Sequence, residues 1–333
     1  MSALKRLAIG FPLQWSHRRA YSLAAIAQPG KAPYFIEWDP GNGTFGEDWT
    51  NAPRDPGGVL LIGPSRWYHP ILISQFALHQ FCVWHSTHDP EALNDFLAQA
   101  AWLRDHQSAD GAPGLYRFEF PWVKYGASVG WCSAMAQGEA ISVLLRADHL
   151  APGQGFGEAA VRASLPFYAD IGRGGVTWRN DRDCFFEEIA NEHAPHVLNG
   201  CIFALWGLWE LWKVTSDANA ARLTNACAKT LREWLPQFDT GWWTLYSLMR
   251  SATGSPHIAT LKYHQFHIAQ MRVLAAMFRD ETFARAASRW SKYVERSPSR
   301  ARLLAAALSS LPERVLGYDT VGRGAAVEWT ASA

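Results

Sequence analysis

The feature that most constrains this chain is a helical hydrophobic pattern that continues from about residue 70 toward the C-terminus. Helices are expected after Pro70 and after Asp89, and then at 133–149, 156–170, 195–214, 217–235, 262–278, 280–295 and 298–309. Short links favour antiparallel helix hairpins, and they alternate with long links rich in Gly, Trp and Tyr at 108–131, 171–194 and 236–261. The pattern predicts an all-α protein folded as an α/α toroid, an incomplete or full (α/α)6 barrel, with its functional groups on the long loops.

Three parts are expected along the chain. Residues 1–66 are predicted to be an irregular N-terminal segment with short β pieces, because Tyr34 to Trp38 is typical of extended chain and a Gly/Pro/Asn/Asp-rich stretch follows. Residues 67–309 are predicted to be the toroid domain. The tail, 310–333, has no pattern that indicates a role.

The charge balance excludes two classes of partner. The chain has 31 Lys+Arg against 30 Asp+Glu, so its formal charge of +1 provides no field for nucleic acid or an anionic membrane. No apolar run approaches the ~20 residues of a membrane span. Arg18-Arg19 resembles a weak twin-arginine signal, but the apolar run behind it is short and ends at Pro29-Gly30. A cytoplasmic protein is therefore expected.

The tryptophans, the cysteines and the motifs that the sequence lacks further restrict the folds and sites that this chain can have. The 17 Trp either fill a core or line a site that stacks flat sugar rings. The five Cys are odd in number and form no C-x-x-C, so reduced, partly buried thiols are expected. The sequence has no phosphate-binding loop, nucleophile elbow, βαβ pattern or TPR consensus, which argues against those folds.

The acidic segment 176–200 is the first candidate for chemistry. It carries five carboxylates, two arginines and two histidines ahead of a very apolar helix. A carboxylate beside aromatic side chains can act as a general base, although a solvated acidic loop would have the same composition. His193-x-x-His196 has no third ligand at a suitable spacing, so no metal site is expected.

The segment 236–267 is the second candidate. Tyr246 and Tyr263 flank a Gly/Ser/Thr-rich loop and stand near Arg250 and His264, whose charge would lower a tyrosine pKa. His267 shares a helix face with His264. Both tyrosines could instead be interfacial, and both histidines could be core residues.

The segment 130–147 begins with Trp131 and opens a helix with small residues. Small residues allow close approach to another helix or to a ligand. Gln137 and Glu139 are polar groups in this apolar element, so each should have a hydrogen-bond partner.

Together these segments resemble the C-terminal catalytic part of the D-glucuronyl C5-epimerases. The strings that carry the resemblance are Gly130 to Ser142, Phe186-Glu187-Glu188, Val197 to Gly200, Asp239-Thr240-Gly241, Tyr246 and Tyr263-His264-x-x-His267. An upstream piece, Trp67 to Ile71, is also similar and includes Tyr68. The resemblance covers about residues 60–296 and implies an α/α toroid that acts on a uronate-containing oligo- or polysaccharide without a cofactor or metal.

The resemblance also implies roles for individual residues. It makes Glu188 the catalytic base, Tyr246 and Tyr263 the site tyrosines, and Asn199 the site asparagine. The substrate-binding candidates are Asn199, Arg250, His264, His267, Gln137, Trp131, Tyr68 and Arg182.

Three departures from the family pattern are visible. Ile189 stands where a tyrosine follows the catalytic glutamate, and Met249 stands where an arginine is expected, with Arg250 next to it. The β-domain that animal members insert after the helix ending near Trp84 is missing at that point. In those members the inserted domain provides a dimerisation surface. Without it the oligomeric state is open, and a homodimer is one possibility.

The resemblance implies epimerisation of glucuronate to iduronate, by abstraction of the C5 proton and reprotonation from the opposite face. Three alternatives stay open. A polysaccharide lyase would follow the same abstraction with β-elimination, a glycoside hydrolase would pair Glu187 or Glu188 with Asp183, and a binding protein would lack catalysis because of Ile189.

Overall fold

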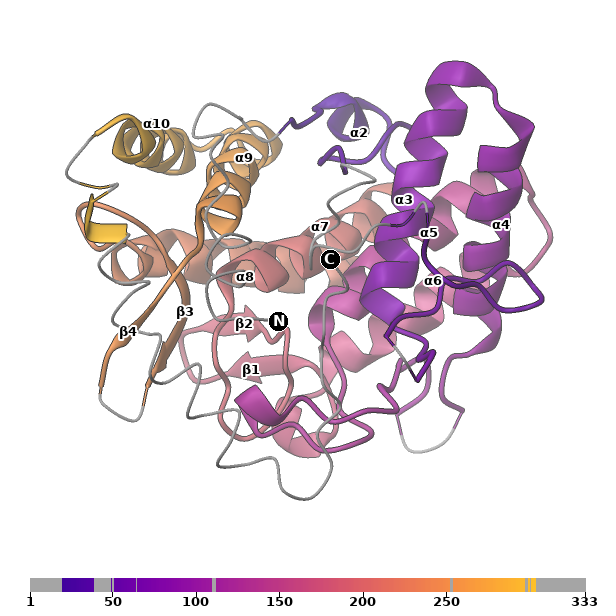
Figure 1. Ribbon diagram of the computed structural model, residues 1–333, viewed down its shortest axis with the longest axis horizontal. Helices are drawn as coiled ribbons and strands as arrows, with labels where there is room; N and C mark the ends of the chain where they lie inside the picture. The colour runs from indigo at the N-terminus through magenta and orange to yellow at the C-terminus, as the bar shows by residue number, and fades with distance from the viewer. Residues whose placement is uncertain are drawn as a thin grey trace. The chain divides into compact units, whose positions relative to one another are not determined.

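The structure is a computed structural model that describes residues 20–38, 49, 51–63, 65–109, 112–251, 254–296, 299 and 301–303. Its contacts divide the described chain into two units, one of residues 22–231 and one of residues 20–21 and 232 onward. Each unit is mostly helical, which confirms the predicted all-α class (Figure 1). A boundary at residue 231 was not predicted, because the sequence analysis treated 67–309 as one domain.

The α-helices lie close to where the periodicity predicts them. Their bounds are α2 (Ala24–Ala27), α3 (Pro70–Thr87), α4 (Pro90–Asp105), α5 (Ala134–Leu150), α6 (Phe156–Ser164), α7 (Leu198–Thr215), α8 (Ala218–Trp234), α9 (Leu261–Phe278) and α10 (Glu281–Glu295). Short 3-10 helices occupy Val123–Tyr125, Leu165–Tyr168, Ile171–Arg173 and Leu235–Phe238. Pairs α3/α4, α5/α6 and α9/α10 pack against each other, as in the helix hairpins that build an α/α toroid.

Helix starts follow the capping chemistry in the sequence. Asp89 accepts a hydrogen bond from the Glu91 amide, and Pro90 occupies the first turn of α4. Ser133 caps α5 in the same way. Helix α7 begins three residues later than predicted, because Ala194 and His196 have positive φ angles of 37° and 51° that no α-helix accommodates.

Helices α5 and α7 approach each other at two glycines. A Cβ on Gly138 would lie 2.5 Å from the Cα of Ala204, and one on Gly207 would lie 1.9 Å from the Gly138 carbonyl oxygen. No side chain larger than hydrogen fits there. The small residues of segment 130–147 therefore serve helix packing, and they fix the backbone of α5 against the helix that begins at Leu198.

The described strands form two antiparallel hairpins inside long loops. In the first unit, β1 (Thr177–Arg179) pairs with β2 (Cys184–Phe186), with Trp178 opposite Phe185. In the second unit, β3 (Leu245–Arg250) pairs irregularly with β4 (Pro256–Ile258). The short strands were expected in residues 1–66, but the described part of that segment has only isolated bridges, such as Ile62 with Trp67.

Several tryptophans fill the cores of the units. Trp206 is fully buried in the first unit, and Trp243 and Trp290 are fully buried in the second. The five cysteines are free thiols, and the sulfur atoms of Cys201 and Cys227 lie 3.5 Å apart. The indole rings of Trp206, Trp243 and Trp290 therefore contribute to stability and are not available to stack on sugars.

Some predictions fall outside the described residues. They are Arg18-Arg19, most of the helix expected at 298–309, and the tail 310–333. Among the helices described between residues 20 and 303, none has the length and apolar character needed to cross a membrane.

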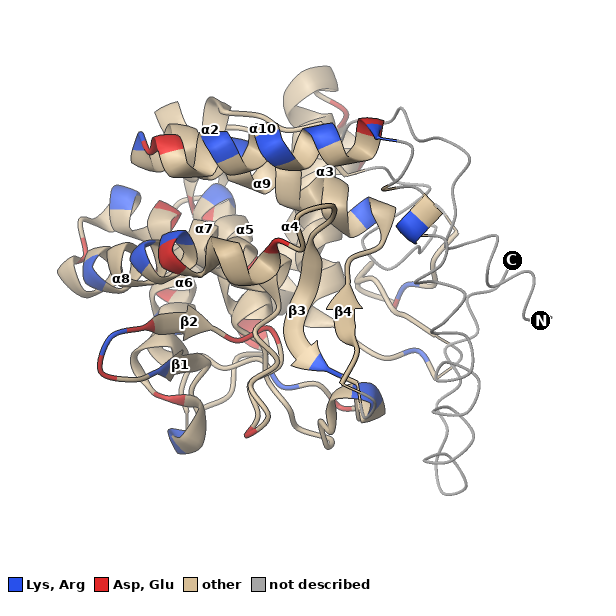
Figure 2. Cartoon of the chain, turned by 90° about the vertical axis from the view of Figure 1, so that its left-hand side faces the viewer, with Lys and Arg blue, Asp and Glu red and all other residues tan. Residues whose placement is uncertain are grey.

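The second unit is organised around Asp239. Its carboxylate accepts hydrogen bonds from the Gly241 amide and from Arg289, Trp290 and Tyr293 of α10, at 2.7–3.0 Å. Figure 2 shows basic residues along the outer face of this helix, whose opposite face is buried. Burial raises the pKa of Asp239, but these hydrogen bonds outweigh burial, so its pKa lies below the usual value.

Replacing Asp239 by Asn should destabilise the protein by about 2–3 kcal/mol at pH 7, because hydrogen bonds to a charged acceptor are lost. Since the folded pKa is lowered, this contribution is complete above the unfolded pKa of about 3.9 and disappears as pH falls through the folded pKa. Urea denaturation at pH 7 and pH 3 should therefore show a smaller difference in stability between the variant and wild type at pH 3 than at pH 7. Asp181→Asn on the exposed loop is the control, and an equal difference at both pH values would contradict the role of Asp239.

Candidate active site

Glu188 lies two residues after the end of strand β2, and its side chain is almost wholly buried in the first unit. Its carboxylate packs on the first turn of α7, where a Cβ on Gly200 would lie 2.2 Å from Oε2 of Glu188. The amino end of a helix favours negative charge, since its first backbone N–H groups have no partner within the helix. The position of Glu188 therefore depends on a glycine at residue 200 and suits an ionised carboxylate.

Gly200→Ala should lower turnover by about 10–100-fold, because the added methyl group displaces the Glu188 carboxylate from its position. The unfolding temperature should fall only slightly. The helix propensity of alanine is about 1 kcal/mol better than that of glycine, which offsets part of the cost of the clash. The matched control is Gly172→Ala, where a Cβ meets no atom within 4 Å. Wild-type turnover in Gly200→Ala would show that Glu188 does not need its present position.

A second carboxyl group lies near Glu188 in the interior of the first unit. Glu139 of α5 is fully buried, and the Gln75 amide nitrogen donates to its two oxygens at 3.0 and 3.2 Å. Burial, with a further contribution from the negative charge of Glu188, raises the pKa of Glu139 well above its usual value, although Gln75 opposes the shift. The interior thus favours the neutral form of the Glu139 carboxyl group over its charged form. Glu139 thus has the hydrogen-bond partner expected from the sequence, whereas its place beside Glu188 was not predicted.

The two predicted tyrosines meet in the second unit. The rings of Tyr246 on β3 and Tyr263 on α9 have centroids 4.6 Å apart at an interplanar angle of 67°. His257 on β4 lies 4.9 Å from the Tyr246 ring, and its Nδ1 lies 2.8 Å from the Ser247 hydroxyl. His257 was not predicted as a site residue from the sequence. Its position between Tyr246 and Tyr263 in the segment 236–267 could have indicated it.

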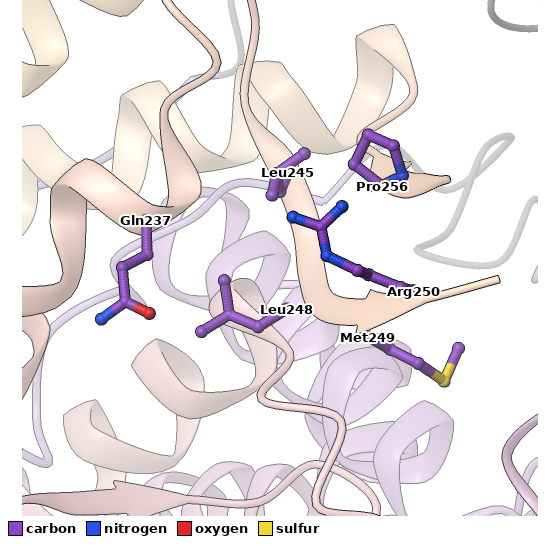
Figure 3. Close-up of a pocket in the computed structure, with 6 residues that line it drawn as sticks. All are labelled: Gln237, Leu245, Leu248, Met249, Arg250 and Pro256. Carbon is purple, nitrogen blue, oxygen red and sulfur yellow. The ribbon is translucent and has the colours of Figure 1, made fainter. Parts of the chain in front are cut away.

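Arg250 lies at the end of β3, beside a hollow in the second unit of about 370 Å³. The residues around the hollow are Gln237, Leu245, Leu248, Met249, Arg250 and Pro256 (Figure 3). The Arg250 guanidinium is exposed, and one of its nitrogens donates to the Gly254 carbonyl at 3.0 Å. A guanidinium that keeps further donors can bind a carboxylate or a sulfate in two-point fashion.

His264 and His267 are core residues of the second unit. Both are fully buried, and their Nδ1 atoms lie 2.8 and 2.9 Å from the Thr244 hydroxyl. His264 also bonds the Trp290 carbonyl oxygen through Nε2 and stacks on Trp243. Burial lowers the pKa of His264 to about 3, so it is uncharged at neutral pH. Both histidines are thus held by contacts within the protein, and substrate contact by either one stays a prediction.

Gln137 holds three backbone segments together. Its amide nitrogen donates to the carbonyls of Gly114 and Ala163, and its oxygen accepts from the Tyr116 amide, all at 2.8 Å. The side chain is fully buried. These bonds use the polar atoms of Gln137, so it has the partner that the sequence analysis expected and has a structural role.

Trp131 and Tyr68 are also held by protein contacts. Trp131 is 6% exposed, stacks on Phe118 at 3.7 Å between ring centroids, and donates to the Phe120 carbonyl. Tyr68 is half-buried, and its hydroxyl donates to Asp55 at 2.8 Å. The indole of Trp131 is therefore part of the aromatic packing.

The remaining predicted residues are placed differently. Arg182 is exposed in the turn between β1 and β2. Asn199 is buried in the first turn of α7, next to the glycine that contacts Glu188. Within the described ranges, no group of three or more His, Cys, Asp or Glu residues has an arrangement that could hold a metal ion.

The structure therefore gathers the predicted residues into two sets, one in each unit. The first unit holds Glu188, Asn199 and the missed Glu139. The second unit holds Tyr246, Tyr263 and Arg250, with the missed His257 beside the tyrosines.

Comparison with known proteins places the chain in a family. It is 31% identical over 212 residues to D-glucuronyl C5-epimerase of Caenorhabditis elegans, which covers 60% of this chain and 34% of that protein. It is 28% identical to an uncharacterized protein of Methanocaldococcus jannaschii, over 53% of this chain and 56% of that protein. The chain thus spans about a third and about half of the lengths of these relatives.

Among solved structures, the chain is similar to unsaturated glucuronyl hydrolase from Bacillus sp. GL1, with a TM-score of 0.47 and 14% identity over 67% of this chain and 61% of that chain. The family described as D-glucuronyl C5-epimerase C-terminus matches residues 110–292, which is more than half of the sequence. The predicted resemblance is thereby confirmed, and the chain belongs to the D-glucuronyl C5-epimerase C-terminal family.

Proposed function

We propose that this protein is a uronyl C5-epimerase that converts glucuronate to iduronate within a glycan. The observation that supports this most is the buried Glu188 carboxylate, fixed against Gly200 at the amino end of α7 within the family-matched residues. The contact between the Tyr246 and Tyr263 rings supports it further, because it places two phenols together. The substrate is a uronate-containing oligo- or polysaccharide.

The chemistry assigns a task to each of these residues. Glu188 takes the C5 proton, and the electron pair of that C–H bond moves into the adjacent carboxylate to give an enolate. The family resemblance assigns to the Tyr263 hydroxyl the return of a proton to C5 from the opposite face. Because the enolate carries extra negative charge, donors and cations must stabilise it, and Arg250, Asn199 and Tyr246 supply them.

β-Elimination is the second candidate. It begins with the same proton abstraction but ends with loss of the 4-oxygen substituent and an unsaturated sugar. Ile189 favours this alternative, because it is a buried aliphatic residue at the position where the family resemblance predicts a tyrosine. One fewer phenol is then available to return the proton.

Proton exchange in D₂O tests the proposal directly. The protein is incubated with glucuronate-containing oligosaccharides that carry different sulfation and acetylation, and products are followed by NMR. Deuterium at C5 together with iduronate signals is the expected result. An unsaturated product absorbing in the near ultraviolet would replace the proposal by a lyase, and reducing-end release without unsaturation would indicate a hydrolase. Oligosaccharide binding without exchange would leave only a binding protein.

A further inference from the structure

A carboxylate–imidazole pair closes the loop that carries Glu188. Both oxygens of Glu187 contact His196: Oε1 lies 2.5 Å from the imidazole Nδ1, and Oε2 accepts from the His196 backbone amide at 3.1 Å. The side chain of Glu187 is fully buried, whereas that of His196 is 16% exposed. Glu187 and His196 are nine residues apart in the sequence. Their contacts therefore fix both ends of the segment 188–195.

Other contacts fix Glu187 and the ring of His196. The Glu187 backbone donates to the Val176 carbonyl at 2.9 Å and accepts from the Ala134 amide at 2.8 Å. The imidazole ring lies edge-on between Trp178 and Phe185, at centroid distances of 4.9 and 5.1 Å. These two aromatic residues are opposite each other on β1 and β2. The imidazole is therefore held by the hairpin as well as by Glu187.

The backbone of this loop has conformations that residues with a Cβ rarely adopt. Ala194 and His196 have φ angles of 37° and 51°, in the left-handed region. Such conformations persist where surrounding contacts impose them, and they concentrate at functional positions. At His196 the two bonds to Glu187 are the contacts that impose the conformation.

We propose that Glu187 and His196 are a positioning pair for Glu188, and that the donor at His196 sets the turnover rate without contacting the substrate. Glu188 lies inside the closed segment and follows Glu187 directly, so loosening the pair releases the backbone that carries the base. The proposal rests on the proposed function, because it assumes that Glu188 is the base.

Two substitutions at His196 test the pair. His196→Asn keeps a donor at the place of Nδ1 and suits the left-handed region, which Asn tolerates better than most residues. His196→Phe keeps a ring between Trp178 and Phe185 but has no donor. We expect kcat to fall by about 10–100-fold in His196→Phe with KM nearly unchanged, and to stay within about threefold of wild type in His196→Asn. His193→Phe, at a histidine whose side chain is 59% exposed, is the control and should leave kcat unchanged.

Amide hydrogen exchange provides a measurement that needs no substrate. Peptides covering residues 188–195 should exchange faster in His196→Phe than in wild type, and His196→Asn should match wild type. Equal exchange in all three proteins, or equal losses of kcat in the Phe and Asn variants, would overturn the proposal. So would a loss that appears in KM alone. If no uronate shows C5 exchange with wild type, the proposed function fails, and the exchange rates of residues 188–195 still decide whether the pair holds this segment.

Discussion

Glu188→Gln is expected to abolish C5 proton exchange, with a loss of about 10²–10⁴-fold on any uronate that the wild-type protein turns over. The substitution replaces one carboxylate oxygen by an amide group of similar size, so the packing against Gly200 is preserved. It removes the basic electron pair that accepts the C5 proton. Affinity for the oligosaccharide should change little, because the proposed ligands of the uronate carboxylate are other residues. Single-turnover exchange in D₂O and binding calorimetry measure the two quantities separately.

The matched control for this prediction is Glu192→Gln, which makes the same chemical change four residues away on a side chain that is 89% exposed. Its exchange rate should equal that of wild type. Thermal unfolding of Glu188→Gln should occur close to the wild-type temperature, because the substitution keeps the size of the side chain that packs against Gly200. Exchange in Glu188→Gln within twofold of wild type would exclude this carboxylate as the base.

Much of the fold was predictable because local rules decide it. The cap at Asp89, the first-turn proline at residue 90 and the hydrophobic periodicity place α4 and most later helices within a few residues. The start of α7 was placed three residues early, since the hydrophobic pattern does not show the left-handed backbone at Ala194 and His196. The two hairpins were missed because strands this short have too few residues to show an alternating pattern.

The site was predictable to a different extent. Motif strings identified the positions of Glu188, Tyr246 and Tyr263, and the two tyrosines do contact each other. The same strings made His264 and Gln137 binding candidates, although both are buried and bonded within the protein. A motif contains residues that hold the site's framework as well as residues that touch substrate, and the hydrogen bonds that reveal a framework residue such as Gln137 are visible only once the fold is known.

The largest stability effect is expected for Arg146→Met in the first unit. The Arg146 guanidinium of α5 and the Glu210 carboxylate of α7 are both fully buried and form two hydrogen bonds, at 2.9 and 3.0 Å. Arg146 also donates to the Ala32 and Ser142 carbonyls, and Glu210 accepts from the Gly30 amide. Removing the arginine leaves a buried, uncompensated carboxylate, and such losses cost about 3–5 kcal/mol. Urea denaturation at pH 7 measures this change.

A double variant separates the lost charge pair from lost packing. Arg146→Met with Glu210→Gln removes both charges, and the glutamine oxygen can still accept from the Gly30 amide. We therefore expect the double variant to be more stable than Arg146→Met alone, because the uncompensated charge is the main cost and not the missing attraction. Arg222→Met on an exposed position of α8 should change stability by less than about 0.5 kcal/mol. If the double variant were as unstable as the single one, the bonds from Arg146 to Ala32 and Ser142, rather than charge balance, would be what holds α5 in place.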